Sequence, residues 1–515
     1  MASHSPVTQD AQRYRPRDTH AERLAAADKA ALARWNSATN TAWYPDYHLA
    51  PFTGWMNDPN GLVCFRDRYH VFYQYHPYSS DWGPMHWGHI TSEDLVHWQH
   101  QPTALAPGDA CDRDGCFSGS AVTCDDKLYM FYTGHFVLDA PTPSNPDAIY
   151  EHQCLAVSSD GIHFEKLGAV VRPPPGYVHF RDPKVWFQEG RWWMVCGARD
   201  SAKDLGQLLL FTSDDLEHWD DSVWQVLAVT EDKNVFMWEC PDFFTMGRRE
   251  DLKILLFCPQ GIRANEYDYR NRFQNGYMAG HWLPGGPWTV QREFRELDRG
   301  HDFYAAQTFM SADNQRRLIL GWLDMWESPM PSKEHGWCGC LTLPRELHYS
   351  ESTGLLRMLP ARELVGLRAP EVTMVPGVVL DDNSDAQLLA DCTAYEVDIT
   401  FNTETSTAEK YGLWLGAEVE LFVDTQSNRL VLNRHYPQYM LSGYRSCEMP
   451  TTVLLRLHVY VDRSSIEVFV NDGEATFSSR IFPDEGDRAL RLFAINGTAD
   501  VVGGNMWKLK ATIEH

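Results

Sequence analysis

From residue 43 onward, the chain is built of short apolar or alternating runs, each preceded by a turn rich in Gly, Asn, Asp or Pro. Such runs predict β-strands. Five of them resemble one another and recur about every 60 residues, at 68–74, 127–133, 191–197, 252–258 and 317–322. A period of this size in β-rich sequence predicts an all-β fold that starts with a five-bladed β-propeller, one four-stranded sheet per repeat. The alternative is an irregular β-sandwich with similar hairpins.

A second repeat lies between these strands, at Ser92–Trp98, Ser158–Phe164 and Ser213–Trp219. Each copy ends in a histidine followed by an aromatic residue. We expect these histidines to be structural and to close successive hairpins rather than to bind a metal.

The repeat stops near Leu347, which predicts a propeller over residues 43–347. Prolines at 360 and 370 favour a linker over residues 348–375. Alternating strands then return and predict a β-sandwich over residues 376–515. They lie at 396–401, 411–415, 453–461 and 465–470, with Asn471–Gly473 as a hairpin turn. We expect this domain to stabilise the propeller; carbohydrate binding is the alternative.

Residues 1–42 predict an N-terminal arm and a helix. The first 20 or so residues are polar and aperiodic, which is typical of disorder. Residues 21–35 are Ala-rich, and Leu24, Ala27 and Ala31 share one helical face with Trp35. We expect this helix to pack on the main domain; an oligomer contact is the alternative.

The net charge of -25, from 45 basic and 70 acidic residues, argues against a nucleic-acid or anionic-membrane partner. The sequence contains neither an apolar signal core nor a run of about 20 apolar residues. Its twelve cysteines are scattered without zinc-site spacing. These features predict a cytoplasmic protein with free thiols. They do not predict an oligomeric state.

Three acids stand within two residues of a proline: Asp58, Asp182 and Glu239. For a single Asp-Pro pair a simple turn is the plainer interpretation. The innermost strands of a propeller, however, converge on one axis, so acids far apart in sequence can meet there. The three together favour one shared site.

Four sequence blocks then carry a resemblance: Trp55–Gly61, Phe117–Ser120, Arg181–Pro183 and Glu239–Pro241. In this order they resemble the signature blocks of glycoside hydrolase family 32, the invertases and fructanases. The resemblance extends from about residue 43 to the end of the chain. It implies a five-bladed propeller followed by a β-sandwich, in agreement with the repeats. It also implies a β-fructofuranosidase that hydrolyses sucrose to glucose and fructose.

The resemblance assigns a role to each acid: Asp58 as nucleophile, Glu239 as acid/base and Asp182 as transition-state stabiliser. Retaining cleavage through an oxocarbenium-like state needs one carboxylate to attack and one acid to protonate the leaving oxygen. We expect Asp182 to stay ionised beside Arg181. Two carboxylates and water complete the cycle, so we expect no metal and no cofactor. The resemblance further implies sugar binding by Asn57, Gln74, Trp82, Phe117, Ser118, Arg181, Tyr304 and Trp322, although Trp82 and Trp322 are also explained by blade packing.

Four other functions remain open. They are a sucrose-6-phosphate hydrolase, a fructosyltransferase, an arabinan-cleaving propeller enzyme and a non-catalytic sugar-binding propeller. The intact Trp55–Gly61 block argues against arabinan, and the three acids argue against a non-catalytic protein. A substrate phosphate would need basic side chains at the rim of the site, for which the candidates are Arg263, Arg270, Arg272, Lys333 and His335. We predict that unphosphorylated sucrose is accepted.

Overall fold

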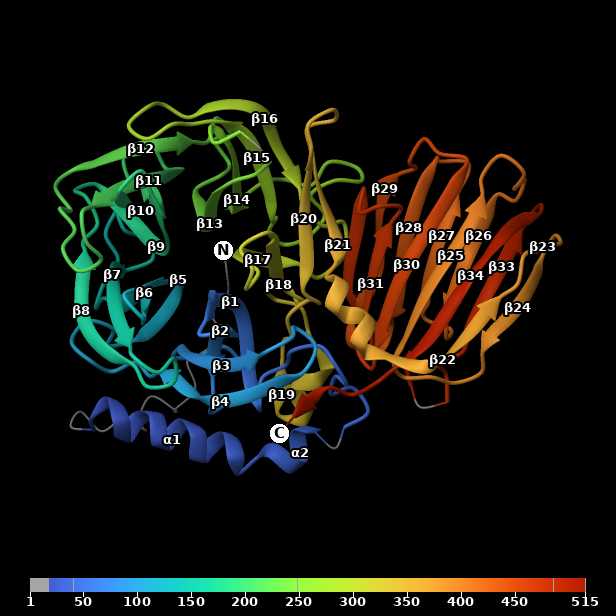
Figure 1. Ribbon diagram of the computed structural model, residues 1–515, viewed down its shortest axis with the longest axis horizontal. Helices are drawn as coiled ribbons and strands as arrows, with labels where there is room; N and C mark the ends of the chain where they lie inside the picture. Colours follow the sequence, from blue (N-terminus) through green and yellow to red (C-terminus); the bar gives the residue numbers. More distant parts are fainter. Residues whose placement is uncertain (1–17, 40, 248, 485, 515) are drawn as a thin grey trace.

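The computed structural model describes residues 18–39, 41–247, 249–484 and 486–514. It is almost entirely β-sheet: a propeller and a β-sandwich lie side by side (Figure 1). The predicted fold class is therefore confirmed. Residues 1–17 of the predicted arm lie outside the described residues.

The propeller contains five sheets of antiparallel strands. Their first strands form a closed ring, because β1 contacts β5, β5 contacts β9, β9 contacts β13, β13 contacts β17, and β17 contacts β1. The repeated segments of the sequence are the second strands of the blades. The blades comprise β1 (Gly54–Phe65), β2 (Arg68–His76), β3 (His86–Ser92) and β4 (Trp98–Leu105); β5 (Gly115–Cys124), β6 (Lys127–Val137), β7 (Ile149–Ser158) and β8 (Glu165–Val171); β9 (Tyr177–Gln188), β10 (Arg191–Asp200), β11 (Leu205–Ser213) and β12 (Trp224–Val229); β13 (Met237–Thr245), β14 (Leu252–Gln260), β15 (Gly276–His281) and β16 (Thr289–Glu296); and β17 (Tyr304–Met310), β18 (Arg317–Trp322), β20 (Arg345–Ser350) and β21 (Leu355–Pro360).

Blade 1 gains two strands from distant parts of the chain. The short β19 (Trp337–Cys338) pairs in parallel with β1 on the inner side. The C-terminal β35 (Ile513–Glu514) pairs in parallel with β4 on the outer side. Blade 1 is thus fixed by a segment that lies between two strands of blade 5 and by the end of the chain.

The second repeat forms the turn between the third and fourth strands of blades 1 to 3. In blade 1, the carboxylate of Asp94 accepts hydrogen bonds from the backbone nitrogens of Val96 and His97 and contacts the His97 ring at 2.7 Å. Equivalent His–Asp pairs occur in the other two turns. These contacts fit the structural role expected for the histidines.

Two sheets form the sandwich. Their strands are β22 (Arg368–Val375), β23 (Val378–Leu380), β25 (Tyr395–Asn402), β30 (Leu454–Asp462), β31 (Ser465–Val470), β32 (Ala475–Arg480) and β34 (Ala499–Leu509) in one sheet, and β24 (Ser384–Leu389), β26 (Lys410–Leu415), β27 (Val419–Asp424), β28 (Arg429–Tyr436), β29 (Leu441–Glu448) and β33 (Leu490–Ile495) in the other. The segment expected to be a linker differs from that expectation, because it holds β21, the short helix η3 (Arg362–Leu367) and β22. Pro370 is tolerated there since β22 is an edge strand whose pairing is interrupted between Arg368 and Val372.

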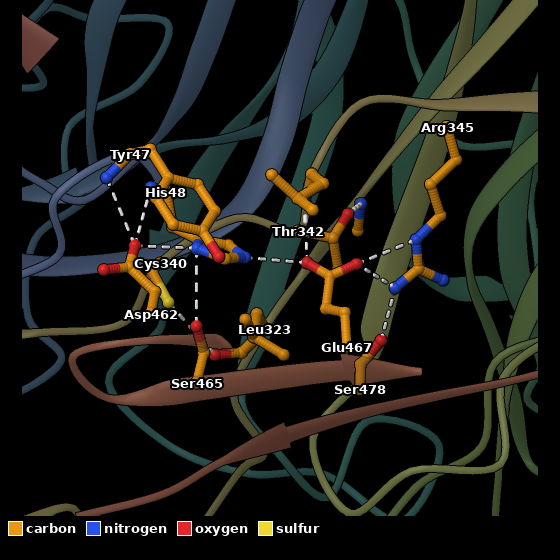
Figure 2. A network of polar contacts seen from close by, with 12 residues as sticks. Tyr47, His48, Leu323, Cys340, Thr342, Arg345, Asp462, Ser465, Glu467 and Ser478 are labelled. Atoms are coloured by element: carbon orange, nitrogen blue, oxygen red, sulfur yellow. Dashed lines mark hydrogen bonds and ion pairs between the residues drawn. The ribbon is translucent and has the colours of Figure 1, made fainter. Parts of the chain in front are cut away.

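A buried charged network joins the two domains (Figure 2). His48 Nδ1 lies 2.9 Å from Asp462 Oδ2, and His48 Nε2 lies 2.9 Å from Glu467 Oε1. Arg345 from blade 5 donates to Glu467 Oε2 at 2.6 Å. Although burial opposes protonation of the imidazole, its hydrogen bonds to Asp462 and Glu467 raise the pKa of His48 to about 9. The histidine is therefore a cation that links two sandwich acids to the propeller.

Helix α1 (His20–Leu32) begins at a capping box, in which Thr19 and Glu22 exchange hydrogen bonds. It packs against β4, where Asp28 accepts from the backbone and hydroxyl of Thr103. A short α2 (Trp35–Thr39) follows. Within the described ranges, no helix has the length and apolar character needed to span a bilayer.

Candidate active site

Each innermost strand is interrupted by a β-bulge at a predicted site residue. The interruptions lie between Met56 and Pro59 in β1, Phe117 and Gly119 in β5, Arg181 and Lys184 in β9, Glu239 and Asp242 in β13, and Tyr304 and Gln307 in β17. A bulge adds an unpaired residue to one strand and redirects its side chain. Asp182, Cys240 and Ala305 adopt left-handed φ angles of 65°, 49° and 51° within these bulges. Such backbone strain is a frequent feature of functional sites.

The carboxylate of Asp58 is held by three donors. Asn57 Nδ2 donates to Oδ1 at 3.0 Å, while Ser118 Oγ donates to Oδ2 at 2.7 Å. The thiol of Cys240 lies 3.5 Å from the same Oδ2. Burial raises the pKa of Asp58, and the hydrogen bonds from Asn57 and Ser118 oppose that rise. The donors thus fix the carboxylate and favour its ionised form.

Asp182 is tied to Cys240 and to blade 2. Its Oδ2 accepts a hydrogen bond from the backbone nitrogen of Cys240 at 2.8 Å, and its own nitrogen donates to Thr133 Oγ1 at 3.0 Å. Burial is the main cause that raises the pKa of Asp182 to about 8; the positive charge of Arg181 opposes this rise, and the negative charges of Glu239 and Asp58 add to it. The ionised state expected for Asp182 therefore stays a prediction, in which the charge of Arg181 has to offset the effect of burial. Arg181 directs its guanidinium at Glu239.

Glu239 accepts four hydrogen bonds. Arg181 donates to Oε1 from Nη2 at 2.6 Å and from Nε at 3.2 Å. The hydroxyl of Tyr304 and the amide of Gln260 both donate to Oε2 at 2.6 Å. The Glu239 side chain keeps 15% of its surface exposed. Its hydrogen bonds thus fix the orientation of the carboxylate, and the exposed part of the side chain is accessible to solvent.

Cys240 connects the three acids. It follows Glu239 in the chain, its nitrogen binds Asp182, and its thiol faces Asp58. Asp182, Ser118 and Cys240 also line one cavity of about 10 Å³. The three acids predicted from the sequence therefore meet in one place.

The remaining predicted sugar-binding residues differ in how far their side chains are exposed to solvent. Trp82 is 48% exposed and meets Phe117 edge to face, with ring centroids 6.1 Å apart. Gln74 is buried, and its amide donates to the carbonyl of Cys116 at 2.9 Å. Trp322 is fully buried against Trp55, with ring centroids 5.8 Å apart. Trp322 therefore supports an aromatic wall from behind rather than facing an open site.

Sequence reasoning missed several side chains that hold the acids. They are Gln260 on Glu239, Thr133 on Asp182, and Glu151 on Arg181. A signal exists only for Glu151, because Glu151, His152 and Gln153 form a polar run inside a strand whose other residues are mostly apolar.

Comparison with known sequences covers both domains. The model of the glycosyl hydrolases family 32 N-terminal domain matches residues 48–360, and that of the family 32 C-terminal domain matches residues 363–508. The chain is 51% identical to a sucrose-6-phosphate hydrolase of Escherichia coli over 487 residues, 95% of this chain and 99% of the relative. It is 49% identical to a raffinose invertase of Escherichia coli over 492 residues, with the same coverage.

Among solved structures, a GH32 beta-fructofuranosidase of Bombyx mori superposes with a TM-score of 0.82 at 32% identity, covering 96% of this chain and 99% of that one. A mutant of that enzyme has been solved in complex with sucrose. The propeller, the sandwich, the assembled acids and these matches lead to one conclusion: the chain is a glycoside hydrolase that belongs to family 32.

Proposed function

We propose that the protein is a retaining β-fructofuranosidase that hydrolyses sucrose through a fructosyl ester on Asp58. The observation that carries the proposal is the junction at Cys240, where an attacking carboxylate, a second carboxyl group and the acid/base residue meet. The Bombyx mori complex with sucrose supports the choice of sugar.

In the first step, Asp58 bonds to the anomeric C2 of fructose while the bond from C2 to the glucosyl oxygen breaks. Glu239 gives its proton to that oxygen, and glucose leaves. In the second step, ionised Glu239 takes a proton from water, the water oxygen bonds to C2, and the ester breaks. Fructose and the Asp58 carboxylate are released, so atoms and charge balance.

Asp182 acts through hydrogen bonds to fructose hydroxyls that strengthen as positive charge develops on the ring. This role requires the ionised form of Asp182, which the charge of Arg181 favours. Asn57, Ser118, Phe117, Trp82 and Tyr304 complete the fructose subsite, with Gln74 and Trp322 behind them.

A sucrose-6-phosphate hydrolase is the second candidate, because the Escherichia coli relative carries that name. Two of the candidate phosphate ligands already have acidic partners: Lys333 lies 2.9 Å from Asp81, and Arg272 lies 3.0 Å from Glu327. Lys333 Nζ also lies 5.1 Å from the centre of the Trp55 ring, beside the site. Because these two cations are already paired with carboxylates, they are less available to bind a phosphate, and this favours the unphosphorylated sugar as substrate.

The two substrates are separated by measuring kcat/KM on sucrose and on sucrose-6-phosphate with one enzyme preparation. We expect sucrose to be hydrolysed with an efficiency comparable to that of the phosphate ester. A preference of about a thousandfold for the phosphate, roughly 4 kcal/mol in the transition state, would overturn the sucrose assignment. The amounts of fructan and free fructose formed at high sucrose concentration separate transfer from hydrolysis. Transfer produces fructan, whereas hydrolysis produces free fructose.

We also propose a cytoplasmic location. It is supported by the twelve cysteines, all of which are free thiols and eight of which are buried.

A further inference from the structure

Arg181 is shared between two carboxylates. Its Nε and Nη2 face Glu239, whereas its Nη1 lies 3.3 Å from Glu151 Oε2. The Glu151 side chain is 1% exposed and comes from β7, the third strand of blade 2. Although burial opposes ionisation, the positive charge of Arg181 and a hydrogen bond from His135 lower the pKa of Glu151 to about 2. Glu151 is therefore a permanent buried anion behind the arginine.

The second oxygen of Glu151 reaches the aromatic wall. Glu151 Oε1 lies 3.0 Å from Nδ1 of His135, its cross-strand neighbour on β6. The His135 ring stacks on Phe117 with centroids 4.0 Å apart and planes 7° apart. One carboxylate thus holds both the arginine that orients the acid/base and the ring that supports a proposed sugar contact.

His179 completes the support of Arg181. Arg181 Nη1 lies 2.9 Å from His179 Nδ1, so this nitrogen must accept, and the other ring nitrogen bears the proton. That nitrogen, Nε2, lies 2.6 Å from Asp147. His179 therefore meets the guanidinium through its accepting nitrogen, and Glu151 is the carboxylate in direct contact with Arg181 on this side.

We infer that Glu151 is a positioning residue of the hydrolytic reaction, which sets the orientation of Arg181 and limits how strongly the guanidinium attracts a negative charge on Glu239. The inference rests on the proposed acid/base role of Glu239. Without Glu151, Arg181 would have Glu239 as its single anionic hydrogen-bond partner among the described residues. The ionised form of Glu239 would then be stabilised further, and proton donation to the leaving group would fail at lower pH.

Other titratable groups also lie around Glu151 and Glu239, and the substitutions at Glu151 do not remove them. The groups facing Glu151 are Arg181, His135 and His179. Those facing Glu239 are Arg181, Tyr304, Asp58, Asp182 and Cys258.

The test compares Glu151→Gln, Glu151→Asp and Glu346→Gln with the parent enzyme. Glu346 on β20 is a matched control, because it also binds two arginines, Arg316 and Arg362. Although burial opposes ionisation, these arginines lower the pKa of Glu346 to about 2. Its ion-pair partners are Arg316, Arg362 and His348, none of which is a proposed site residue, so its loss tests stability alone.

We expect Glu151→Gln to move the alkaline limb of the kcat/KM profile on sucrose about half a pH unit or more toward lower pH. We also expect turnover of sucrose to fall about tenfold, with a smaller loss on a fructoside that has an activated leaving group. Glu151→Asp should restore the limb, whereas Glu346→Gln should lower the melting temperature and leave the limb unchanged.

An unchanged alkaline limb in folded Glu151→Gln, or equal losses on the two substrates, would overturn the inference while the parent enzyme still hydrolyses sucrose. A parent enzyme inactive on every β-fructoside would overturn the proposed function, and the inference with it. If Glu151→Gln does not fold, Glu151→Asp decides through the substrate comparison: a loss concentrated on sucrose supports the inference, and equal losses overturn it.

Discussion

Arg181 and Glu239 form a two-point contact in which both guanidinium donors reach the same carboxylate oxygen, at 2.6 and 3.2 Å. The other oxygen of Glu239 is held by Tyr304 and Gln260. This arrangement fixes Glu239, the proposed acid/base residue, from two sides. Its orientation comes from three different blades of the propeller.

Replacing Glu239 by alanine removes the proposed proton donor. We expect turnover of sucrose to fall by about a thousandfold, within the usual range for general acid/base catalysis. A fructoside with an activated leaving group should lose far less in the first step, and azide should restore part of the turnover by attacking the fructosyl ester. Steady-state rates on both substrates, with and without azide, measure this. Equal losses on the two substrates would count against the acid/base assignment.

Ser118→Ala removes a hydrogen bond that favours ionised Asp58. The pKa of Asp58 should therefore rise, and the acid limb of kcat/KM should move about one pH unit toward higher pH, since hydrogen bonds to charged groups contribute about 1.5 to 3 kcal/mol. The matched control is Ser120→Ala, because Ser120 is buried on the same strand but donates to the carbonyl of Pro183. A shift of the same size in Ser120→Ala would contradict the specific effect of the Ser118 hydrogen bond on Asp58.

Gly197 is needed for the close approach of blades 3 and 4. A Cβ atom there would lie 1.8 Å from the carbonyl oxygen of Trp238, next to Glu239. We expect Gly197→Ala to destabilise the fold by about 2 kcal/mol or more and to lower kcat. Gly366→Ala serves as control, since its Cβ would meet Val96 at an ordinary 3.6 Å. Thermal unfolding and kcat are measured for both variants. Similar melting temperatures for the two would contradict the packing argument for Gly197.

The buried His48 predicts a dependence of stability on pH. Its folded pKa of about 9 exceeds the usual value of 6.5, so its contribution is complete below pH 6.5 and is lost as the pH rises through about 9. At the acid end, Asp462 and Glu467 have lowered pKa values, so their contribution is lost as the pH falls through those values.

His48→Gln should therefore destabilise the protein by about 3 kcal/mol near neutral pH, and by less above pH 9. Melting temperatures of the parent and the variant across this range measure the effect. The exposed His97, which pairs with Asp94, provides the control: His97→Gln should have little effect. A destabilisation by His48→Gln that is the same at pH 6 and pH 10 would be inconsistent with a charged His48.

Much of the fold follows from local patterns, because each blade repeats one strand motif and one turn motif. Long-range pairing does not: β19 and β35 are two-residue strands that owe their conformation to blade 1 rather than to their own sequence. The acids were found because a proline follows each closely. The hydrogen-bond partners of Arg181 were not found, since Arg181 precedes Asp182 in sequence but turns to Glu239 and Glu151 through the bulge in β9.

A covalent bond between Asp58 and fructose is the step on which the proposed retaining mechanism depends, and trapping that ester tests whether it forms. Glu239→Ala is mixed with an activated β-fructoside, quenched rapidly, digested and examined by mass spectrometry. Because the variant retains the nucleophile but lacks the base for the second step, the peptide containing Asp58 should gain the mass of one fructosyl unit. Consumption of the substrate with no adduct, or with an adduct on another residue, would show that Asp58 is not the nucleophile.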